Sequence, residues 1–171
     1  GGPAEAEAGD SEGGPAAVYS AALAGQELRL RELLDCRADP NEASPDGFTP
    51  LFGAAHEGHL SCLRLLLDRR AEPDRPIAEG AAPLFIAAQK GQDACVRELL
   101  VRQADPNRTG PDGFTPTCAA AMAGREASLR VLLVWRADIE KATSDGFTPL
   151  LVAAHRGHPS CLAMLLDCRA D

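Results

Sequence analysis

The hydrophobic and polar positions of this 171-residue chain repeat with a fixed step of 33 residues. Leucine pairs begin at positions 33, 66, 99, 132 and 165, and alanines lie at 38, 71, 104, 137 and 170. Glycines at 25, 58, 91, 124 and 157 and prolines at 50, 83, 116 and 149 keep the same step. Because four markers share one period without an insertion, the sequence predicts an array of structural repeats.

Each period predicts two short helices joined by a turn. In the second period an Asp-Gly turn precedes Thr49, which can cap a helix, and Pro50, which suits a first helical turn. A helix over 51–56 would end at Gly58, and a second helix over 60–68 carries apolar residues at helical spacing. One such pair cannot bury its apolar side alone, so the pattern predicts an elongated solenoid of stacked pairs.

Three motifs, taken together with the period, resemble the ankyrin repeat: Asp-Gly-Phe-Thr-Pro-Leu, Ala-Ala-His-x-Gly-His and Leu-Leu-Leu-Asp-x-Arg-Ala-Asp-Pro-Asn. The resemblance implies an all-α solenoid of stacked helix-turn-helix units with hairpin-like loops. The array would cover 17–171, in copies at 17–45, 46–78, 79–111, 112–144 and 145–171. An acidic tail rich in Gly, Ala and Pro precedes it at 1–16.

The copies depart from the family pattern in three respects. Where the family has Gly after the second helix, this chain has Arg37, Arg70, Gln103, Arg136 and Arg169. A non-Gly residue there costs about 1 kcal/mol if the left-handed backbone is kept. The copy at 79–111 has Glu-Gly-Ala-Ala-Pro in place of the turn motif, so we expect its turn to be lost. The family's helix-one His is replaced by Phe52, Phe85, Cys118 and Leu151, so we do not expect its usual hydrogen bond to Thr.

Composition and charge exclude several classes of function. The hydrophobic fraction of 45% and charged fraction of 25% are those of a folded protein, and with 4% aromatic residues the core must consist mainly of Ala, Leu and Val. The net charge of −8 argues against a nucleic-acid partner, since phosphate contacts need clustered Lys and Arg. No apolar run approaches the roughly 20 residues that cross a bilayer, so we expect no direct membrane insertion.

The histidines do not predict a metal site. His56 and His59 lie three residues apart, as do His155 and His158, which is a spacing that can bind zinc on a helix. However, a glycine interrupts the helix within each pair, and no carboxylate or thiol completes a ligand set. We therefore expect neither a metal nor another cofactor.

The cysteines are expected to be packing residues. Cys62, Cys95 and Cys161 share one repeat position on the apolar stripe of the second helix. Cys36 and Cys168 share an exposed position four periods apart, too far for an intrachain disulfide. We expect free thiols in a reducing intracellular compartment. The cytoplasm is the preferred compartment, and an organelle is the alternative.

The resemblance also implies where a partner would bind. In the family, the concave face is made of loop tips and of the exposed ends of the first helices. The residues of this chain that match those places are Phe48, His56, Glu57, Gln89, Lys90, Phe114, Met122, Phe147, His155 and Arg156. For the phenylalanines, packing on the neighbouring tip is the alternative. Trp135 is a secondary candidate, because other copies have Cys or Arg at its position, which predicts exposure.

No nucleotide-binding, hydrolase or metalloprotease motif is present in the sequence. The resemblance therefore implies a non-catalytic scaffold that binds one or more partner proteins through its concave face. One alternative is an accessory subunit fixed in a large assembly, such as an algal organellar membrane-protein complex. Another is the targeting module of a larger enzyme.

Overall fold

The computed structural model describes residues 15–168 of the chain, and within this range it contains helices and no strands. The residues that were expected to form an acidic tail lie, up to residue 14, outside the described part. The helices are α1 (Pro15–Leu23), α2 (Glu27–Asp35), α3 (Pro50–Glu57), α4 (Leu60–Asp68), α5 (Pro83–Lys90), α6 (Asp93–Val101), α7 (Pro116–Met122), α8 (Glu126–Val134), α9 (Pro149–Arg156) and α10 (Pro159–Asp167), with a short 3-10 segment, η1 (Pro111–Gly113).

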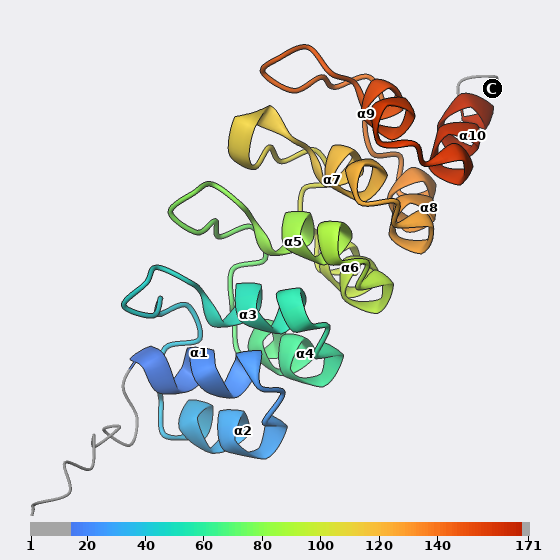
Figure 1. Ribbon diagram of the computed structural model, residues 1–171. Helices are drawn as coiled ribbons and strands as arrows, with labels where there is room; N and C mark the ends of the chain where they lie inside the picture. The colour runs from blue at the N-terminus through green and yellow to red at the C-terminus, as the bar shows by residue number, and fades with distance from the viewer. Residues whose placement is uncertain (1–14, 169–171) are drawn as a thin grey trace, which may run out of the picture.

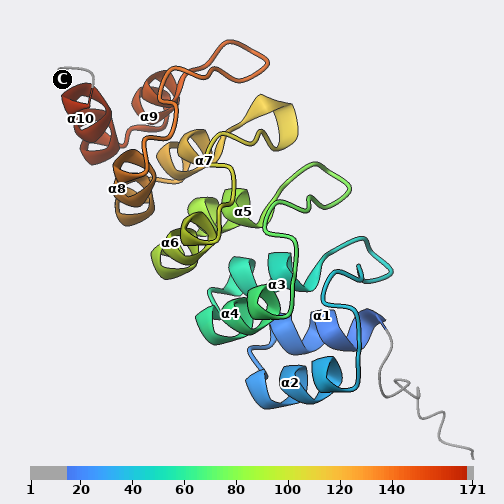
Figure 2. The same cartoon turned by 180° about the vertical axis from the view of Figure 1, so that it is seen from behind.

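The helices form two parallel rows (Figure 1). The inner row is α1, α3, α5, α7 and α9, and the outer row is α2, α4, α6, α8 and α10, each helix packing against the next member of its own row. A long loop projects from the array before each of α3, α5, α7 and α9, as both views show (Figures 1 and 2). This arrangement confirms the predicted all-α solenoid of helix pairs.

Small residues allow the inner helices to lie close together. The pairs Ala54-Ala55, Ala87-Ala88 and Ala120-Ala121 are completely buried between consecutive inner helices. The outer row supplies leucines and three cysteines at one repeat position, and Cys62, Cys95 and Cys161 are buried as predicted. Burial raises the pKa of the Cys95 thiol to about 11. Cys36 and Cys168 are exposed at the opposite ends of the outer row.

The inner helices begin as the sequence predicts, with one exception. The hydroxyl oxygens of Thr49, Thr115 and Thr148 accept hydrogen bonds from the third residue of the helix that follows, at 3.2, 3.1 and 3.4 Å. Each is followed by a proline, which needs no N–H partner in the first turn. The exception is α5, whose first turn follows Ala82 and has no side-chain cap.

The expectation that the copy at 79–111 lacks its turn is wrong. The N–H of Ile77 donates to the carbonyl oxygen of Ala81 at 2.9 Å, as that of Ser44 does to Phe48 at 2.8 Å in the copy before. Gly80 has φ +88°, which matches φ +83° at Gly47. The turn persists because a left-handed glycine and two backbone hydrogen bonds close it, the second from the N–H of Gly80 to the carbonyl oxygen of Ile77 at 2.9 Å. What this copy has lost is the threonine cap.

Four outer helices, α2, α4, α6 and α8, end in left-handed residues that are not glycines, and Arg169, the equivalent residue after α10, lies outside the described residues. Arg37, Arg70, Gln103 and Arg136 have φ of 67°, 69°, 67° and 56°, which confirms the expected geometry. In the first copy, the N–H of Arg37 donates to Leu34 O and that of Ala38 to Leu33 O, both at 3.1 Å, and this pattern recurs in the next three copies. These two bonds are those of a Schellman cap. They offset the strain of about 1 kcal/mol that a side chain brings to this conformation.

Neighbouring repeats are also joined at the ends of the inner helices. Gly58, Gly91, Gly124 and Gly157 have φ of 81°, 81°, 65° and 72°, left-handed as predicted. The N-cap residues of α6, α8 and α10 contact the inner helix of the preceding repeat. Gln92 contacts the carbonyl oxygen of His56 at 3.3 Å, and Arg125 that of Gln89 at 3.2 Å. The ring of His158 contacts the carbonyl oxygen of Met122 at 3.1 Å. His158 therefore links two repeats through its ring.

Candidate protein-binding surface

Loops project from one side of the array (Figure 1), and the predicted binding residues belong to these loops or to the C-terminal turns of α3, α5, α7 and α9. We call this side the loop face: the loops, together with the C-terminal turns of α3, α5, α7 and α9. The phenylalanines Phe48, Phe114 and Phe147 do not lie at the loop tips, as expected from the resemblance, but one residue before the N-cap threonines. Each phenylalanine comes after the turn at the end of its loop. The ring of Phe48 lies beside that of Phe52 in α3, and the ring of Phe147 lies beside that of His155 in α9.

The N-terminal part of the loop face is occupied by contacts within the chain. The ring of Phe48 stacks on Tyr19 with centroids 5.9 Å apart and lies 5.7 Å from the ring of Phe52, which in turn stacks on His56 at 6.4 Å. Nδ1 of His56 lies 2.7 Å from a carboxylate oxygen of Glu57. Burial raises the pKa of the Tyr19 phenol, and the charges of Asp46 and Glu57 raise it further. Three of the predicted residues, Phe48, His56 and Glu57, are therefore engaged in contacts within the chain.

The middle of the loop face has no aromatic side chain at the position that precedes the N-cap. Ala81 occupies the position of the phenylalanines and is buried. Lys90 is exposed, and the backbone carbonyl of Gln89 accepts the bond from Arg125. Neither Gln89 nor Lys90 is among the residues that line the cavity next to α7 and α9 described below.

The C-terminal part of the loop face is open. Five of the predicted residues line one cavity of about 160 Å³, namely Phe114, Met122, Phe147, His155 and Arg156. We call it the loop-face cavity. Phe147 is 43% exposed, and its ring centroid lies 6.3 Å from that of His155. Sequence reasoning missed the other three lining residues, Thr143, Asp145 and Val152, because they carry no signal in the repeat pattern.

Comparison with known proteins agrees with this architecture. A family model described as "Ankyrin repeats (3 copies)" matches residues 18–110 and 84–171. The chain belongs to the ankyrin-repeat family. A search of the curated proteins finds no match. Ankyrin repeats are in general protein–protein interaction modules and are typically not catalytic.

Three ionisable side chains of this ankyrin array come together at the loop-face cavity. Asp145, His155 and Arg156 line the loop-face cavity, yet within residues 15–168 no hydrogen bond or ion pair joins any two of them. Nucleophilic catalysis needs a base within hydrogen-bond reach of a nucleophile and oriented by a third group. The same described range contains no cluster of three His, Cys, Asp or Glu side chains placed to hold a metal. What this cavity offers instead is an apolar floor with charged groups at its edge.

Two further predictions concern the outside of the ankyrin array. Trp135 lies at the end of α8 in the outer row, away from the loop face, and is exposed as predicted, with 43% of its surface accessible. None of the helices between residues 15 and 168 is both long and apolar enough to span a bilayer.

Proposed function

We propose that this ankyrin array binds a partner protein through its loop face and carries out no catalysis of its own. The observation that supports the proposal is the loop-face cavity, because it is lined by five of the residues that the resemblance to the family assigned to the binding face. They come from two loops and from the ends of α7 and α9, so only the stacked array brings them together.

The chemistry of the loop-face cavity favours a protein partner with mixed charge. Phe114, Met122 and Phe147 supply apolar surface that fits one large side chain of the partner, while Asp145 and Arg156 present charges of both signs at its edge. A polyanion such as nucleic acid would be repelled by Asp145 and by the overall charge of −8. Affinity is expected to concentrate on the aromatic residues near the centre of the patch.

The test begins with the native protein, purified with its bound partners, which mass spectrometry identifies. Binding of the captured partner is then measured for alanine variants. We expect Phe114→Ala to weaken binding by about 1–3 kcal/mol while the fold is retained. Leu28→Ala, at an exposed position of the outer row, serves as the matched control and should leave this affinity unchanged. If Trp135→Ala abolishes binding and Phe114→Ala has no effect, the loop face is not the binding site.

The other two functions considered, a permanent subunit of a large assembly and the targeting arm of an enzyme, gain no support. The hypothesis of permanent association drew on the acidic tail, whose first 14 residues lie outside the described range. We also propose an intracellular, reducing compartment. The support for it is that Cys62, Cys95, Cys118 and Cys161 are buried as packing residues and that Cys36 and Cys168 lie at opposite ends of the array.

A further inference from the structure

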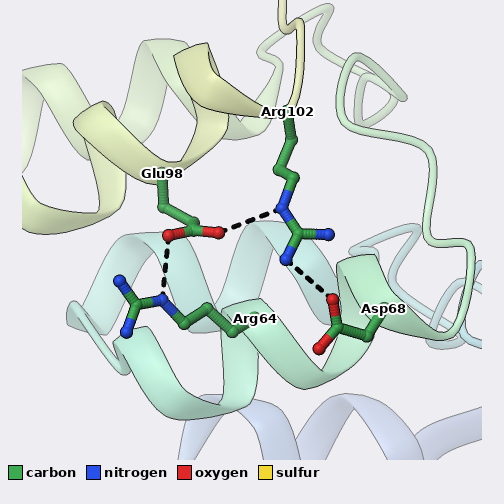
Figure 3. Close-up of polar contacts among 4 residues, drawn as sticks. All are labelled: Arg64, Asp68, Glu98 and Arg102. Atoms are coloured by element: carbon green, nitrogen blue, oxygen red, sulfur yellow. Dashed lines mark hydrogen bonds and ion pairs between the residues drawn. The ribbon is translucent and has the colours of Figure 1, made fainter.

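Charged side chains hold the outer row together between α4 and α6 (Figure 3). Nε of Arg64 donates to Glu98 at 2.8 Å, and the second oxygen of Glu98 accepts from Nε of Arg102 at 3.0 Å. The guanidinium of Arg102 also donates to Asp68 at 2.7 Å. We call Arg64, Asp68, Glu98 and Arg102 the charged quartet. Two of its three contacts join side chains 34 residues apart, so they link one repeat to the next.

The equivalent positions one period later have a different chemistry. Adding 33 to each number of the charged quartet gives Arg97, Val101, Val131 and Trp135. Three charged groups have become apolar, and Arg97 alone remains. Val131 takes the place of the carboxylate that pairs with Arg64, so Arg97 has lost its inter-repeat partner.

These residues border a cavity of about 210 Å³ on the outer row between α6 and α8, lined by Asp93, Arg97, Ala127, Arg130, Val131, Val134 and Trp135. We call it the outer-row cavity. Val134 is 74% exposed and Trp135 43%, and nearby Val101 is 55% exposed. Large exposed apolar side chains that gather at one place commonly mark an interaction site.

The charge of the outer-row cavity is opposite to that of the protein. Arg97 and Arg130 are exposed, and within residues 15–168 neither forms an ion pair. Against these two cations stands one carboxylate, Asp93, whereas the whole chain has a net charge of −8. An unpaired arginine beside an exposed tryptophan combines the two residue types that most often anchor protein interfaces.

We propose that the outer-row cavity is a second docking site, which binds a segment of a partner protein carrying a carboxylate close to a large apolar side chain. The apolar side chain packs on Trp135 and Val134. The carboxylate pairs with Arg97, as Glu98 pairs with Arg64 one repeat earlier. The proposal goes beyond binding at the loop face and does not depend on it, since the two cavities have no lining residue in common.

The test uses a random 12-residue peptide library displayed on phage and selected on the full chain. The reference protein is the triple variant Val101→Asp, Val131→Glu, Trp135→Arg. Together with Arg97, these substitutions place the residue types of the charged quartet at the equivalent positions of the next repeat. Because the same four side chains are accommodated between α4 and α6, this variant should keep its fold, as checked by thermal melting. We expect the peptides enriched on the full chain over the variant to carry Asp or Glu within about three residues of Leu, Phe or Trp.

Synthetic copies of the enriched peptides are then measured by fluorescence anisotropy. Arg97→Glu should weaken binding at least about tenfold, and peptides with Lys in place of the carboxylate should recover affinity for that variant. Phe147→Ala in the loop-face cavity is the matched control and should leave the affinity unchanged, so that failure here and failure at the loop face can be told apart.

Three outcomes would overturn the proposal. One is a selection that enriches no peptide over the triple variant, and another is enrichment of basic peptides. The third is self-association of the unmodified chain that the triple variant abolishes, because this would assign the surface to a second copy. Sedimentation velocity over a range of concentrations measures that outcome.

Discussion

The first two repeats and the last two use one backbone frame for opposite surface properties. Near the N-terminus, the loop face is filled by the stack of Tyr19, Phe48 and Phe52, and Asp35 and Arg69 on the outer row pair at 2.8 Å. Near the C-terminus, Phe147 stands 43% exposed over the loop-face cavity, and Val134 is 74% exposed in the outer row. At these positions of the repeat, the side chains are therefore paired within the chain at one end and unpaired at the other.

The difference shows that, in a solenoid, the backbone arrangement of the repeats and the properties of their surface depend on different residues. The frame depends on small residues, left-handed turns and leucines, which recur in every copy. The surface depends on whether the side chain one repeat away supplies a partner. Val131 stands at the repeat position of Glu98 and offers no carboxylate to Arg97, and no ring of the preceding copy covers Phe147. At these two positions the side chain has no partner one repeat away in the described part of the array and can contact another molecule.

The largest effect expected concerns the reactivity of the cysteines. Cys36 and Cys168 are exposed and should react quickly with iodoacetamide, whereas Cys62 and Cys95 should react about a thousandfold more slowly. Burial raises the pKa of Cys95 to about 11, so little thiolate forms at pH 8 while the site is closed, and reaction requires local opening. Mass spectrometry of each labelled peptide over time gives the rates. If the last repeat is the less covered one, Cys161 loses protection at lower urea concentrations than Cys62, and equal midpoints would contradict the comparison.

Substitutions at the glycines that end the inner helices distinguish a repeat that contacts a following repeat from the last repeat. A Cβ on Gly124 would lie 2.7 Å from the His158 ring, whereas a Cβ on Gly157 would meet nothing within 4 Å, although both have positive φ. We expect Gly124→Val to lower the free energy of unfolding by about 1–3 kcal/mol and Gly157→Val by about 1 kcal/mol. Urea unfolding measures both values, and equal losses would show that contact between repeats adds nothing to backbone strain.

The two ends should also respond differently to loss of a phenylalanine. Phe48→Ala removes a half-buried ring from a stack of aromatic residues, so we expect about 2 kcal/mol of lost stability. Phe147→Ala removes an exposed ring and should change stability by less than about 0.5 kcal/mol. Thermal melting ranks the two variants. A larger loss for Phe147→Ala would mean that the loop-face cavity is part of the core.

The smallest effect expected concerns the core of the fourth copy. Ser128 is completely buried, and its hydroxyl has no hydrogen-bond partner within the described chain, while the equivalent residues are Cys62, Cys95 and Cys161. Ser128→Cys should raise the free energy of unfolding by about 1 kcal/mol, because it removes an unsatisfied buried hydroxyl. The reciprocal control, Cys95→Ser, should lower it by a similar amount. If Ser128→Cys is neutral or destabilising, a partner for this hydroxyl exists in solution.

Much of the frame could be predicted because its causes are local in sequence. The N-caps depend on a threonine and the residue three positions later, and the Schellman caps on six consecutive residues. The exposure of Trp135 and the burial of Cys62 followed from the residue types found at equivalent positions. The lost turn at 79–111 was predicted wrongly because the motif was given more weight than Gly80, which keeps the left-handed conformation.

By itself the sequence determined the family, the helices and the left-handed positions, because each depends on a motif of a few residues repeated every 33. Only the tertiary structure decided which surfaces are closed. The stack of Tyr19 on Phe48 and the pairing of Arg64 with Glu98 join side chains 29 and 34 residues apart, from different repeats. Whether such side chains meet depends on how far one repeat rotates and advances over the next, and a periodic sequence does not specify this, because every copy carries the same local signal.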